Sequence, residues 1–333
     1  MSILKPLIVI LGPTSSGKTE MSLKLAKKYN GEIVNADSRQ VYQEMEIATG
    51  SPISSRWFHS PEGLWNQNEA RMQKSSTALT GLWNYRENDK MFIIDNIPHH
   101  LFHIKKPNQK FSLAQYKKLA IKTINDIHKQ GKVPILVGGT GLYISSIVDN
   151  LEIPQAPPNN KIRTKLEKHT GKYLFKKLKE IDSKSADIIG PHNKRKLIRA
   201  LEVFELTGKP FSIQQTKGKP LFDVLLIGIK TDREKLYKKI DSRVDEMMKQ
   251  GLLDETENLI KKYKTDLPAM SGIGYQELNS YLHAEMSLEE AIQRIKFRTH
   301  QYARRQITWF KKDERILWIE NHKEAERLLK KFL

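Results

Sequence analysis

The stretch LIVILGPTSSGKTE, from Leu7 to Glu20, restricts the fold of this chain more than any other feature. An apolar run with strand character leads directly into Gly-x-x-x-x-Gly-Lys-Thr, and helical residues follow. Glycines in such a loop allow backbone N–H groups to surround phosphate oxygens. Lys18 is expected to reach the terminal phosphates, and the Thr19 hydroxyl to ligate Mg²⁺. The pattern therefore predicts an α/β domain that binds a nucleotide, including ATP, or another polyphosphate. The expected phosphate-binding positions are Gly12, Pro13, Thr14, Ser15, Ser16, Gly17, Lys18 and Thr19.

A second apolar run, VPILVGGTGLYI (Val133–Ile144), also opens into a Gly-rich turn and then a helix. It reads as a buried parallel strand with the geometry of a second phosphate cradle. Because loops at the carboxyl ends of neighbouring parallel strands lie together, the sequence places a ligand site between the two loops.

The rest of the chain divides into a core and an insertion. Pro154, Pro157 and Pro158 mark a junction, and beyond them helical patterns cover 162–181 and 194–206. Another buried strand follows at 222–229, so the sheet resumes after the helices. We therefore predict an α/β fold: a P-loop NTPase-like parallel sheet flanked by helices, formed by 1–153 and 213–333, with a helical insertion domain at 154–212. Helices are also expected at 112–130, 234–250, 254–263 and 287–311, and residues 51–95 form an irregular insertion without periodicity.

Composition limits the function classes. The 333 residues include 57 Lys and Arg against 38 Asp and Glu, a formal net charge of +19, and no cysteine. The absence of cysteine excludes disulfides, thiol nucleophiles and thiolate zinc sites. The apolar windows are far shorter than the roughly 20 residues of a membrane span, and no signal-peptide cleavage site precedes the Gly-rich loop. We expect a cytoplasmic, monomeric protein without membrane contact, whose charge suits either nucleic acid or simple solvation.

Asp37 is the candidate acid of the site. It follows the expected strand at 32–36, on the edge of the sheet that carries the phosphate loop, where a carboxylate can ligate metal or take a proton. Capping the next helix is the alternative role. A Walker B carboxylate would be expected in a hydrolase or kinase, yet none of the other apolar strands ends in Asp; Asp95 follows an apolar run only within the irregular segment.

Eight motifs occur along the chain in the order LGPTSSGKT, NADSRQVY, PHHLF, PILVGGTGLY, RKLIRALEV, SRVDEMMKQGLLDE, GIGYQEL and THQYARRQITWF. In this order they resemble the tRNA dimethylallyltransferase family, also called tRNA isopentenyltransferases or IPP transferases. The resemblance covers nearly the whole chain except about 51–95. In place of the family's Thr-Ala-Lys-Pro, this chain has Thr49-Gly50-Ser51-Pro52, which lacks the lysine.

The resemblance implies a prenyl transfer. The dimethylallyl group of dimethylallyl diphosphate would pass to the N6 amine of the adenosine 3′-adjacent to the tRNA anticodon, and the phosphate loop would hold the leaving diphosphate with Mg²⁺ as cofactor. Asp37 would accept the proton of the adenine amine, Thr140 would lie at the channel between donor and base, and Arg243 would contact the diphosphate. The expected catalytic residues are thus Asp37, Thr140 and Arg243, and the expected metal ligand is Thr19.

The resemblance also implies that the helical insertion grips the anticodon stem-loop. The expected tRNA-binding residues are Asp37, Ser38, Arg39, Gln40, Thr140, Arg163, Arg195, Lys196, Leu197, Ile198 and Arg199. Arg195 and Arg199 share one helical face, which suits phosphates, and a merely solvated surface is the alternative. Basic residues around Tyr302 and Trp309 on the late helix suit RNA, although these two aromatics can also be core.

Three other functions fit parts of the sequence. An adenylate isopentenyltransferase would perform the same chemistry on free AMP, ADP or ATP, and would not need a tRNA-gripping insertion. An RNA-associated P-loop NTPase would need a Walker B acid and an arginine finger. A catalytically silent RNA-binding protein would have little use for Lys18, Thr19 and Asp37 together.

Overall fold

The computed structural model describes residues 4–52, 84–86, 91–214 and 216–333. The chain forms two compact units, a larger one of Met1–Ile144 with Phe222–Leu333 and a smaller one of Ser145–Leu221. The smaller unit contains the predicted 154–212 insertion and extends beyond it at both ends. Each unit is described on its own below.

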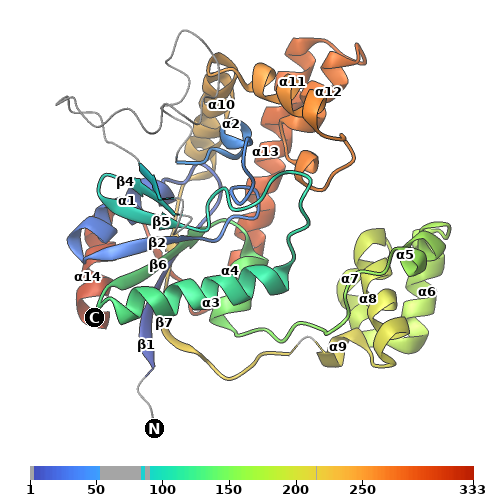
Figure 1. Cartoon of the computed structure of the whole chain (residues 1–333), viewed down its shortest axis with the longest axis horizontal. Coiled ribbons are helices and arrows are strands. Elements are labelled where there is room, and N and C mark those ends of the chain that lie inside the picture. Colours follow the sequence, from blue (N-terminus) through green and yellow to red (C-terminus); the bar gives the residue numbers. More distant parts are fainter. Residues whose placement is uncertain (1–3, 53–83, 87–90, 215) are drawn as a thin grey trace. The chain divides into compact units, whose positions relative to one another are not determined.

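The larger unit is built on one sheet that has eight strands within the described residues (Figure 1). In sequence order the strands are β1 (Lys5–Leu11), β2 (Gly31–Asn35), β3 (Asn84–Arg86), β4 (Met91–Ile94), β5 (Ile97–His100), β6 (Val133–Gly138), β7 (Phe222–Ile229) and β8 (Leu317–Ile319). In space their order is β3-β4-β5-β2-β6-β1-β7-β8, and the run from β5 to β8 is parallel. The predicted P-loop-like parallel sheet is confirmed, with β6 and β1 as neighbours so that the two Gly-rich loops emerge side by side.

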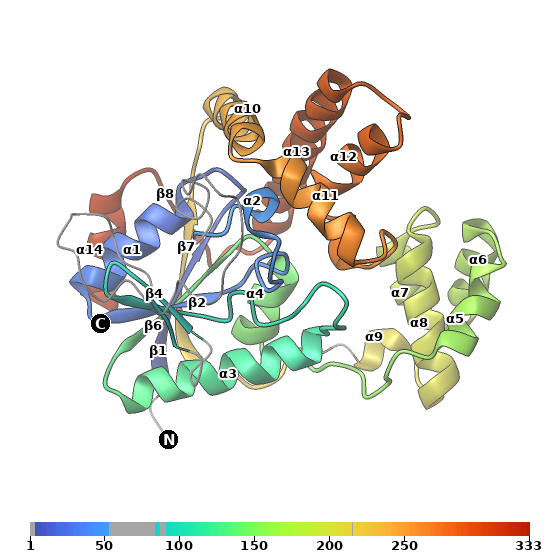
Figure 2. The same ribbon diagram turned by 45° about the horizontal axis from the view of Figure 1, so that its top comes forward.

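Helices cover both faces of this sheet (Figure 2). α1 (Lys18–Lys28) and α14 (His322–Phe332) pack on one face, where their apolar side chains meet Ile8, Ile33 and Val137 in a continuous core. α3 (Leu113–Lys129) lies on the opposite face. Alternate residues of each strand thus face different helices, which explains why the strands are apolar throughout rather than alternating.

A group of helices gathers at the end of the sheet where the parallel strands finish (Figure 1). It comprises α10 (Arg233–Lys249), α11 (Leu252–Lys262), α12 (Tyr275–Leu282) and α13 (Leu288–Phe310), with the short α2 (Glu46–Thr49) against α11. The Ser287 side chain accepts the Glu290 backbone N–H at the start of α13, the bond expected from the Ser-x-x-Glu signature. These helices place basic and aromatic side chains over the Gly-rich loops.

The smaller unit is helical. After α4 (Gly141–Val148), which crosses from the larger unit, it contains α5 (Asn160–Glu167), α6 (Gly171–Ile181), α7 (Ser183–Ile189), α8 (Lys194–Thr207) and α9 (Phe211–Gln214). Leu174, Leu178 and Leu201 are fully buried in its core. The continuous helix predicted over 162–181 is wrong, because Thr170 accepts the Tyr173 backbone N–H and so starts a new helix.

The irregular segment is described only in part, since 53–83 and 87–90 lie outside the described residues, together with the tryptophans at 57, 65 and 83. Its described strands, β3 and β4, extend the sheet in antiparallel pairing. Asp95 and Asn96, with φ of 50° and 64°, form the tight turn between β4 and β5. Asp95 therefore lies at the edge where the parallel strands begin, opposite to the phosphate loop, and cannot serve as a Walker B acid.

The described part of the chain contains no helix that is both long and apolar enough to cross a membrane.

Candidate active site

The phosphate loop joins β1 to α1 and depends on its glycines. Gly12 has φ of 153° and Gly17 has φ of 91°, a region that residues with a Cβ rarely adopt. A Cβ on Gly12 would also lie 3.0 Å from Ser16 Oγ. The backbone turns here so that the start of α1 faces the pocket, where the N–H groups of a helix terminus favour an anion.

Polar atoms in this loop are arranged for a ligand. The hydroxyl oxygens of Ser15 and Ser16 are buried and have no hydrogen-bond partner among the described residues. Lys18 Nζ folds back to donate to Pro13 O over 2.6 Å. Burial lowers the pKa of Lys18 to about 8, an effect that Asp37 opposes and Arg243 reinforces. The loop thus holds a partly desolvated cation and unsatisfied donors, a set that fits a diphosphate.

Asp37 follows β2 in a tight turn. Its Oδ1 accepts the Arg39 backbone N–H over 2.9 Å, and its own N–H donates to Asn35 Oδ1 over 2.8 Å. The next helix, α2, begins at Glu46, so Asp37 does not cap a helix and the alternative role considered from the sequence is wrong. The carboxylate lies in the pocket lining, where it attracts the charges of Lys18 and Arg243.

The Gly-rich loop after β6 is shaped by close packing. A Cβ on Gly138 would lie 2.2 Å from Ala36 O, and a Cβ on Gly141 would lie 2.3 Å from the Trp309 ring. Thr140 fastens this loop to the turn beside Asp37, since its Oγ1 accepts the Ser38 N–H over 3.0 Å and its N–H donates to Ala36 O over 3.2 Å. These contacts explain the glycines without a second phosphate.

Side chains from remote helices complete the site. Arg243 of α10 donates to Thr14 Oγ1 over 3.2 Å and to Thr49 O over 3.4 Å, and a Cβ on Gly50 would collide with its guanidinium group. Gln40 donates to the carbonyl oxygens of Thr49 and Gly50. Arg39 reaches in the other direction, to Pro268 O at 2.8 Å. Residues that the sequence assigned to the diphosphate or to tRNA therefore also hold the pocket together.

The α2 helix that supplies Thr49 and Gly50 is itself held by a buried carboxylate. Glu255 of α11 accepts the backbone N–H groups of Glu46 and Ile47 over 2.9 and 2.8 Å, and the Tyr275 hydroxyl over 2.8 Å. Burial raises the pKa of Glu255 to about 7, and burial together with Glu255 raises the pKa of Glu46 to about 8. Ser51, in the motif where the resemblance led us to expect a lysine, is 3% exposed.

These elements enclose a cavity of about 780 Å³. Its lining includes the predicted residues Thr14, Ser15, Ser16, Gly17, Lys18, Thr19, Asp37, Ser38, Arg39, Gln40, Thr140 and Arg243. The described residues contain no group of three or more His, Asp or Glu that could hold a metal ion. The Thr19 hydroxyl fits Mg²⁺ only as one ligand among diphosphate oxygens and waters, which is a common mode for this ion.

Residues of α13 that the sequence did not assign to the catalytic pocket also line it, among them Tyr302, Gln306 and Trp309. Tyr302 lies beside Thr140, Trp309 packs on Gly141, and Gln306 is buried between the two Gly-rich loops. They lie at i, i+4 and i+7 and therefore share one helical face. The spacing of these residues within YARRQITWF indicates that they share a helical face. The sequence could not show which loops this face contacts, because that depends on the order of the strands in the sheet.

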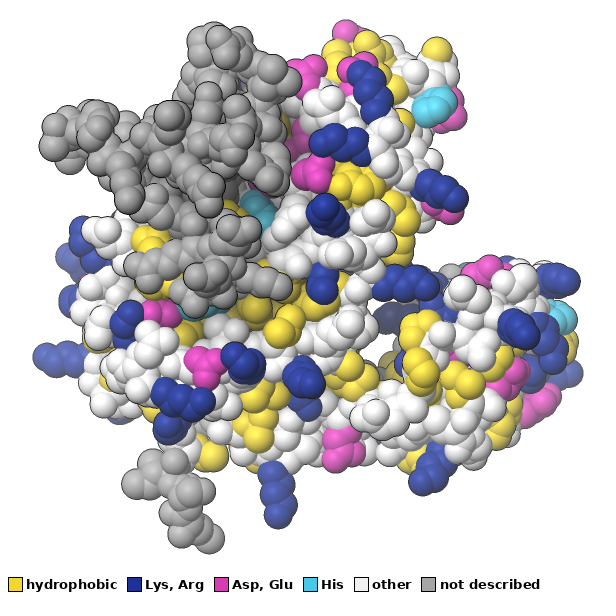
Figure 3. Space-filling view, in the orientation of Figure 1, with side chains coloured by type: hydrophobic (Ala, Val, Ile, Leu, Met, Phe, Trp, Pro, Cys, Tyr) yellow, Lys and Arg dark blue, Asp and Glu magenta, His cyan; other side chains and the backbone are white. Residues whose placement is uncertain are grey.

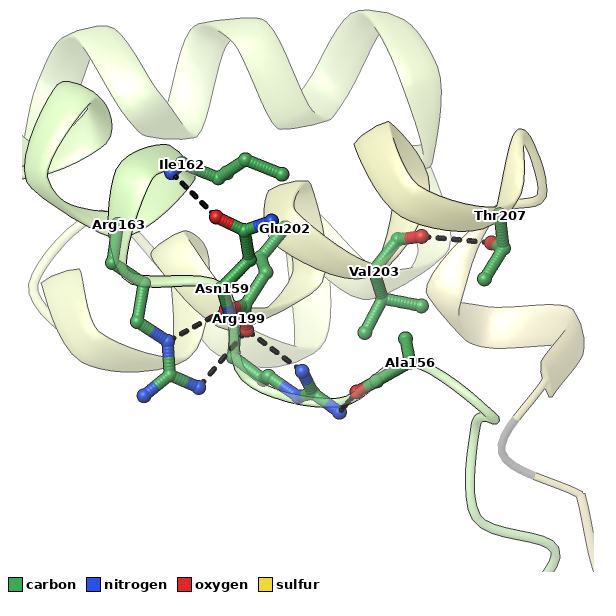
Figure 4. A network of polar contacts seen from close by, with 8 residues as sticks. All are labelled: Ala156, Asn159, Ile162, Arg163, Arg199, Glu202, Val203 and Thr207. Atoms are coloured by element: carbon green, nitrogen blue, oxygen red, sulfur yellow. Dashed lines mark hydrogen bonds and ion pairs between the residues drawn. The ribbon is translucent and has the colours of Figure 1, made fainter.

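In the smaller unit, two of the expected tRNA-binding arginines are held by one acid (Figure 4). Glu202 is fully buried and accepts two hydrogen bonds from Arg163, at 2.7 and 2.9 Å, and one from Arg199 at 2.7 Å. Arg199 also donates to Ala156 O over 2.8 Å. These two guanidinium groups tie α5, α8 and the entry segment together.

The other expected residues of α8 separate into surface and core. Arg195 and Lys196 are exposed. Figure 3 shows that Lys and Arg side chains are frequent on the surface of the smaller unit. Leu197 and Ile198 are 0% and 6% exposed and belong to the core of the unit. Only the first pair has side chains free to meet a phosphate backbone.

Comparison with known families gives matches along most of the chain. The family described as IPP transferase matches residues 88–313, and the family described as isopentenyl transferase matches residues 5–68. Two relatives are proteins named tRNA dimethylallyltransferase. The one from Anoxybacillus flavithermus is 39% identical over 94% of this chain and 89% of its own length, and the one from Caldanaerobacter subterraneus is 40% identical over 97% and 94%.

Solved structures agree with these matches. The tRNA isopentenylpyrophosphate transferase of Bacillus halodurans is 32% identical, with a TM-score of 0.64 over 98% of this chain and 97% of that one. A eukaryotic dimethylallyltransferase acting on tRNA is 27% identical, with a TM-score of 0.70 over 95% of this chain and 74% of that one. The resemblance seen in the eight motifs is thereby confirmed.

Proposed function

The chain belongs to the IPP transferase family, and we propose from this premise that it is a tRNA dimethylallyltransferase. It transfers the dimethylallyl group of dimethylallyl diphosphate to the N6 amine of the adenosine 3′-adjacent to the anticodon, and it releases diphosphate. One observation beyond the family carries the proposal: the phosphate loop and the Asp37 carboxylate line the same cavity.

In this reaction the diphosphate leaving group and the adenine amine bind at different parts of the cavity. The phosphate loop, Lys18 and Arg243 bind the diphosphate, whose negative charge grows as the allylic C–O bond breaks. Thr19 would supply one oxygen ligand to Mg²⁺, which would neutralise part of that charge. Asp37 accepts the proton that the adenine amine loses as its nitrogen bonds to the allylic carbon. Thr140, tied to the turn beside Asp37, lines the passage between the two.

The target adenosine has to leave its stack to reach this cavity, as in other enzymes that act on a base. Arg305 lines the cavity with its guanidinium group 5.9 Å from the Tyr302 ring centre, and Arg304, Trp309 and Lys312 line a neighbouring surface hollow. A π-face flanked by cations suits a flipped base and its phosphates. In the smaller unit, Arg195 and Lys196 supply charge for the anticodon stem-loop.

The test is a label-transfer assay. Labelled dimethylallyl diphosphate and Mg²⁺ are supplied with an anticodon stem-loop RNA that carries the target adenosine, beside parallel reactions with AMP and with ATP alone. Label in the RNA only is expected. Label in AMP would replace the proposal with an adenylate isopentenyltransferase, and phosphate release from ATP would replace it with an NTPase.

A further inference from the structure

Gln306 joins the two loops that border the cavity. Its Oε1 accepts the Thr14 backbone N–H of the phosphate loop over 2.9 Å. Its Nε2 donates to Gly139 O of the loop after β6 over 2.9 Å. The side chain is 5% exposed, so both bonds form away from bulk water, where an unmade bond is costly.

The surroundings leave Gln306 little freedom. A Cβ on Gly139 would lie 2.2 Å from Gln306 Nε2, so the glycine is required for the amide to reach its carbonyl partner. On the other side, Thr14 is held a second time through its Oγ1 by Arg243. The neighbouring turns of α13 carry Tyr302 and Trp309 against the same Gly-rich loop.

We propose that Gln306 is a positioning residue that sets the separation between the diphosphate cradle and the loop carrying Thr140. The amide is suited to this role because it offers one acceptor and one donor at the end of a single side chain. It also takes up the Thr14 N–H, whereas the N–H groups of Ser15 and Gly17 stay available for the diphosphate. The inference rests on the proposed transfer reaction, in which the donor carbon lies between these two loops.

A positioning role of Gln306 affects the distance between the reacting atoms more than the affinity for either substrate. Each loop can still bind its own partner if the link is lost, but the amine and the allylic carbon are no longer held at attacking distance, and misplacement by about 1 Å costs about 100-fold in rate. Loss of Gln306 is therefore expected to lower kcat and to leave KM for dimethylallyl diphosphate nearly unchanged.

The kinetic test uses Gln306→Met, which removes both hydrogen bonds at similar volume, with Gln293→Met as the matched control at an exposed position of the same helix. We expect kcat to fall about 10- to 100-fold in the first variant, with KM within threefold, and no change in the control. A folded Gln306→Met protein with kcat within twofold of wild type would overturn the proposal. A loss confined to KM would also overturn it, because Gln306 would then be a binding residue.

A second variant gives a signature that general loosening of the fold would not produce. In Gln306→Glu, one carboxylate oxygen can still accept the Thr14 N–H. When the carboxyl is ionised, its other oxygen faces the Gly139 carbonyl oxygen and the two acceptors repel. When the carboxyl is protonated, its O–H can donate to Gly139 O. Burial favours the protonated form. The ratio of kcat in this variant to kcat in wild type is therefore expected to rise several-fold from pH 8 to pH 6, while the Gln306→Met ratio stays flat. A flat ratio for both variants would overturn the hydrogen bond to Gly139 as the cause.

A third readout does not depend on activity and separates this proposal from the proposed function. Hydrogen exchange of the Thr14 amide, measured without substrate, is expected to be at least about tenfold faster in Gln306→Met than in wild type or Gln293→Met. Unchanged protection would show that Gln306 does not hold this loop. Failure of wild-type prenyl transfer would leave the exchange result intact and would count only against the proposed function.

Discussion

The backbone N–H of Ser38 donates a hydrogen bond of 3.0 Å to Thr140 Oγ1. The turn after β2 and the loop after β6 are thereby joined beside Asp37, and the acid occupies a fixed position in the cavity. Residues that are about 100 positions apart in the sequence meet because β2 and β6 are neighbours in the sheet.

Asp37→Asn is expected to lower kcat at least about 100-fold and to leave tRNA affinity within threefold, because an amide cannot accept the proton of the adenine amine. Single-turnover transfer and filter binding of tRNA measure the two effects. Asp95→Asn is the matched control, since Asp95 lies at the opposite edge of the sheet in a turn that tolerates Asn. Near-wild-type turnover in Asp37→Asn would remove Asp37 from the mechanism.

The pKa of Lys18, lowered to about 8 by burial, predicts a pH dependence for donor binding. Lys18 is charged below this pH and neutral above it, so the diphosphate loses a cationic partner as the pH rises. We expect kcat/KM for dimethylallyl diphosphate to be flat from pH 6.5 to 7.5 and to fall above about pH 8, because this parameter reports the free enzyme. Lys24→Met, on the exposed side of α1, is expected to keep the same profile. A flat wild-type profile up to pH 9.5 would contradict the assignment.

Arg163→Ala is expected to destabilise the smaller unit by about 2–3 kcal/mol, because Glu202 remains buried with one of its two cationic partners removed. Hydrogen exchange across the peptides of 145–221 measures the change. Lys165→Ala, an exposed position on the same helix, is the control and is expected to have no effect. Equal protection in both variants would show that the Arg163 bonds to Glu202 contribute little.

Arg195→Ala is expected to weaken tRNA binding without changing the stability of the smaller unit, since this side chain is exposed. One lost phosphate contact reduces the slope of log K against log salt by about 1. The measurement is tRNA affinity at four or more salt concentrations, with Arg327→Ala on α14 as a matched exposed control. If the slope of log K against log salt is the same in both variants, Arg195 does not contact a phosphate and is only a solvated surface residue.

Glu46→Gln is expected to stabilise the larger unit at high pH. The pKa of Glu46 is about 8 in the folded protein and near 4.5 in the unfolded chain, so between these values the unfolded chain binds fewer protons. The free energy of unfolding of the wild-type protein therefore falls as the pH rises through this window. The neutral amide of the variant does not ionise, so its stability does not fall for this reason. Thermal unfolding should give equal Tm values for both proteins at pH 5 and a higher Tm for the variant at pH 8.5. A difference that is the same at both pH values would contradict this account.

Local signals in the sequence predicted much of the fold. Strand and helix positions around the phosphate loop followed from apolar runs and glycines, and β7 was predicted with the bounds it has. The break at Thr170 was missed because the apolar period continues through it, and only the cap distinguishes two helices from one. The antiparallel pairing of β4 lay beyond reach because short strands in an irregular segment carry little periodicity.

A site residue could be predicted where one motif contains both the residue and the strand that positions it. Lys18 and Asp37 each follow a strand and lie where the strand ends, as expected. Gln306 could not be assigned, because its role depends on which loops α13 meets across nearly 300 positions of sequence. The bond from Arg199 to Glu202 could not be predicted, because no local signal in the sequence shows that Glu202 is buried beside it.

The place of β1 in the sheet has a consequence for synthesis of the chain. β1 lies between β6 and β7, and β7 begins only after the whole smaller unit has been made. β1, which leaves the ribosome long before β7, thus keeps one apolar edge unpaired until residues 222–229 emerge. An edge of this kind can pair with other chains. The insertion therefore lengthens the interval in which the nascent protein depends on protection from aggregation, whatever it contributes to the mature enzyme.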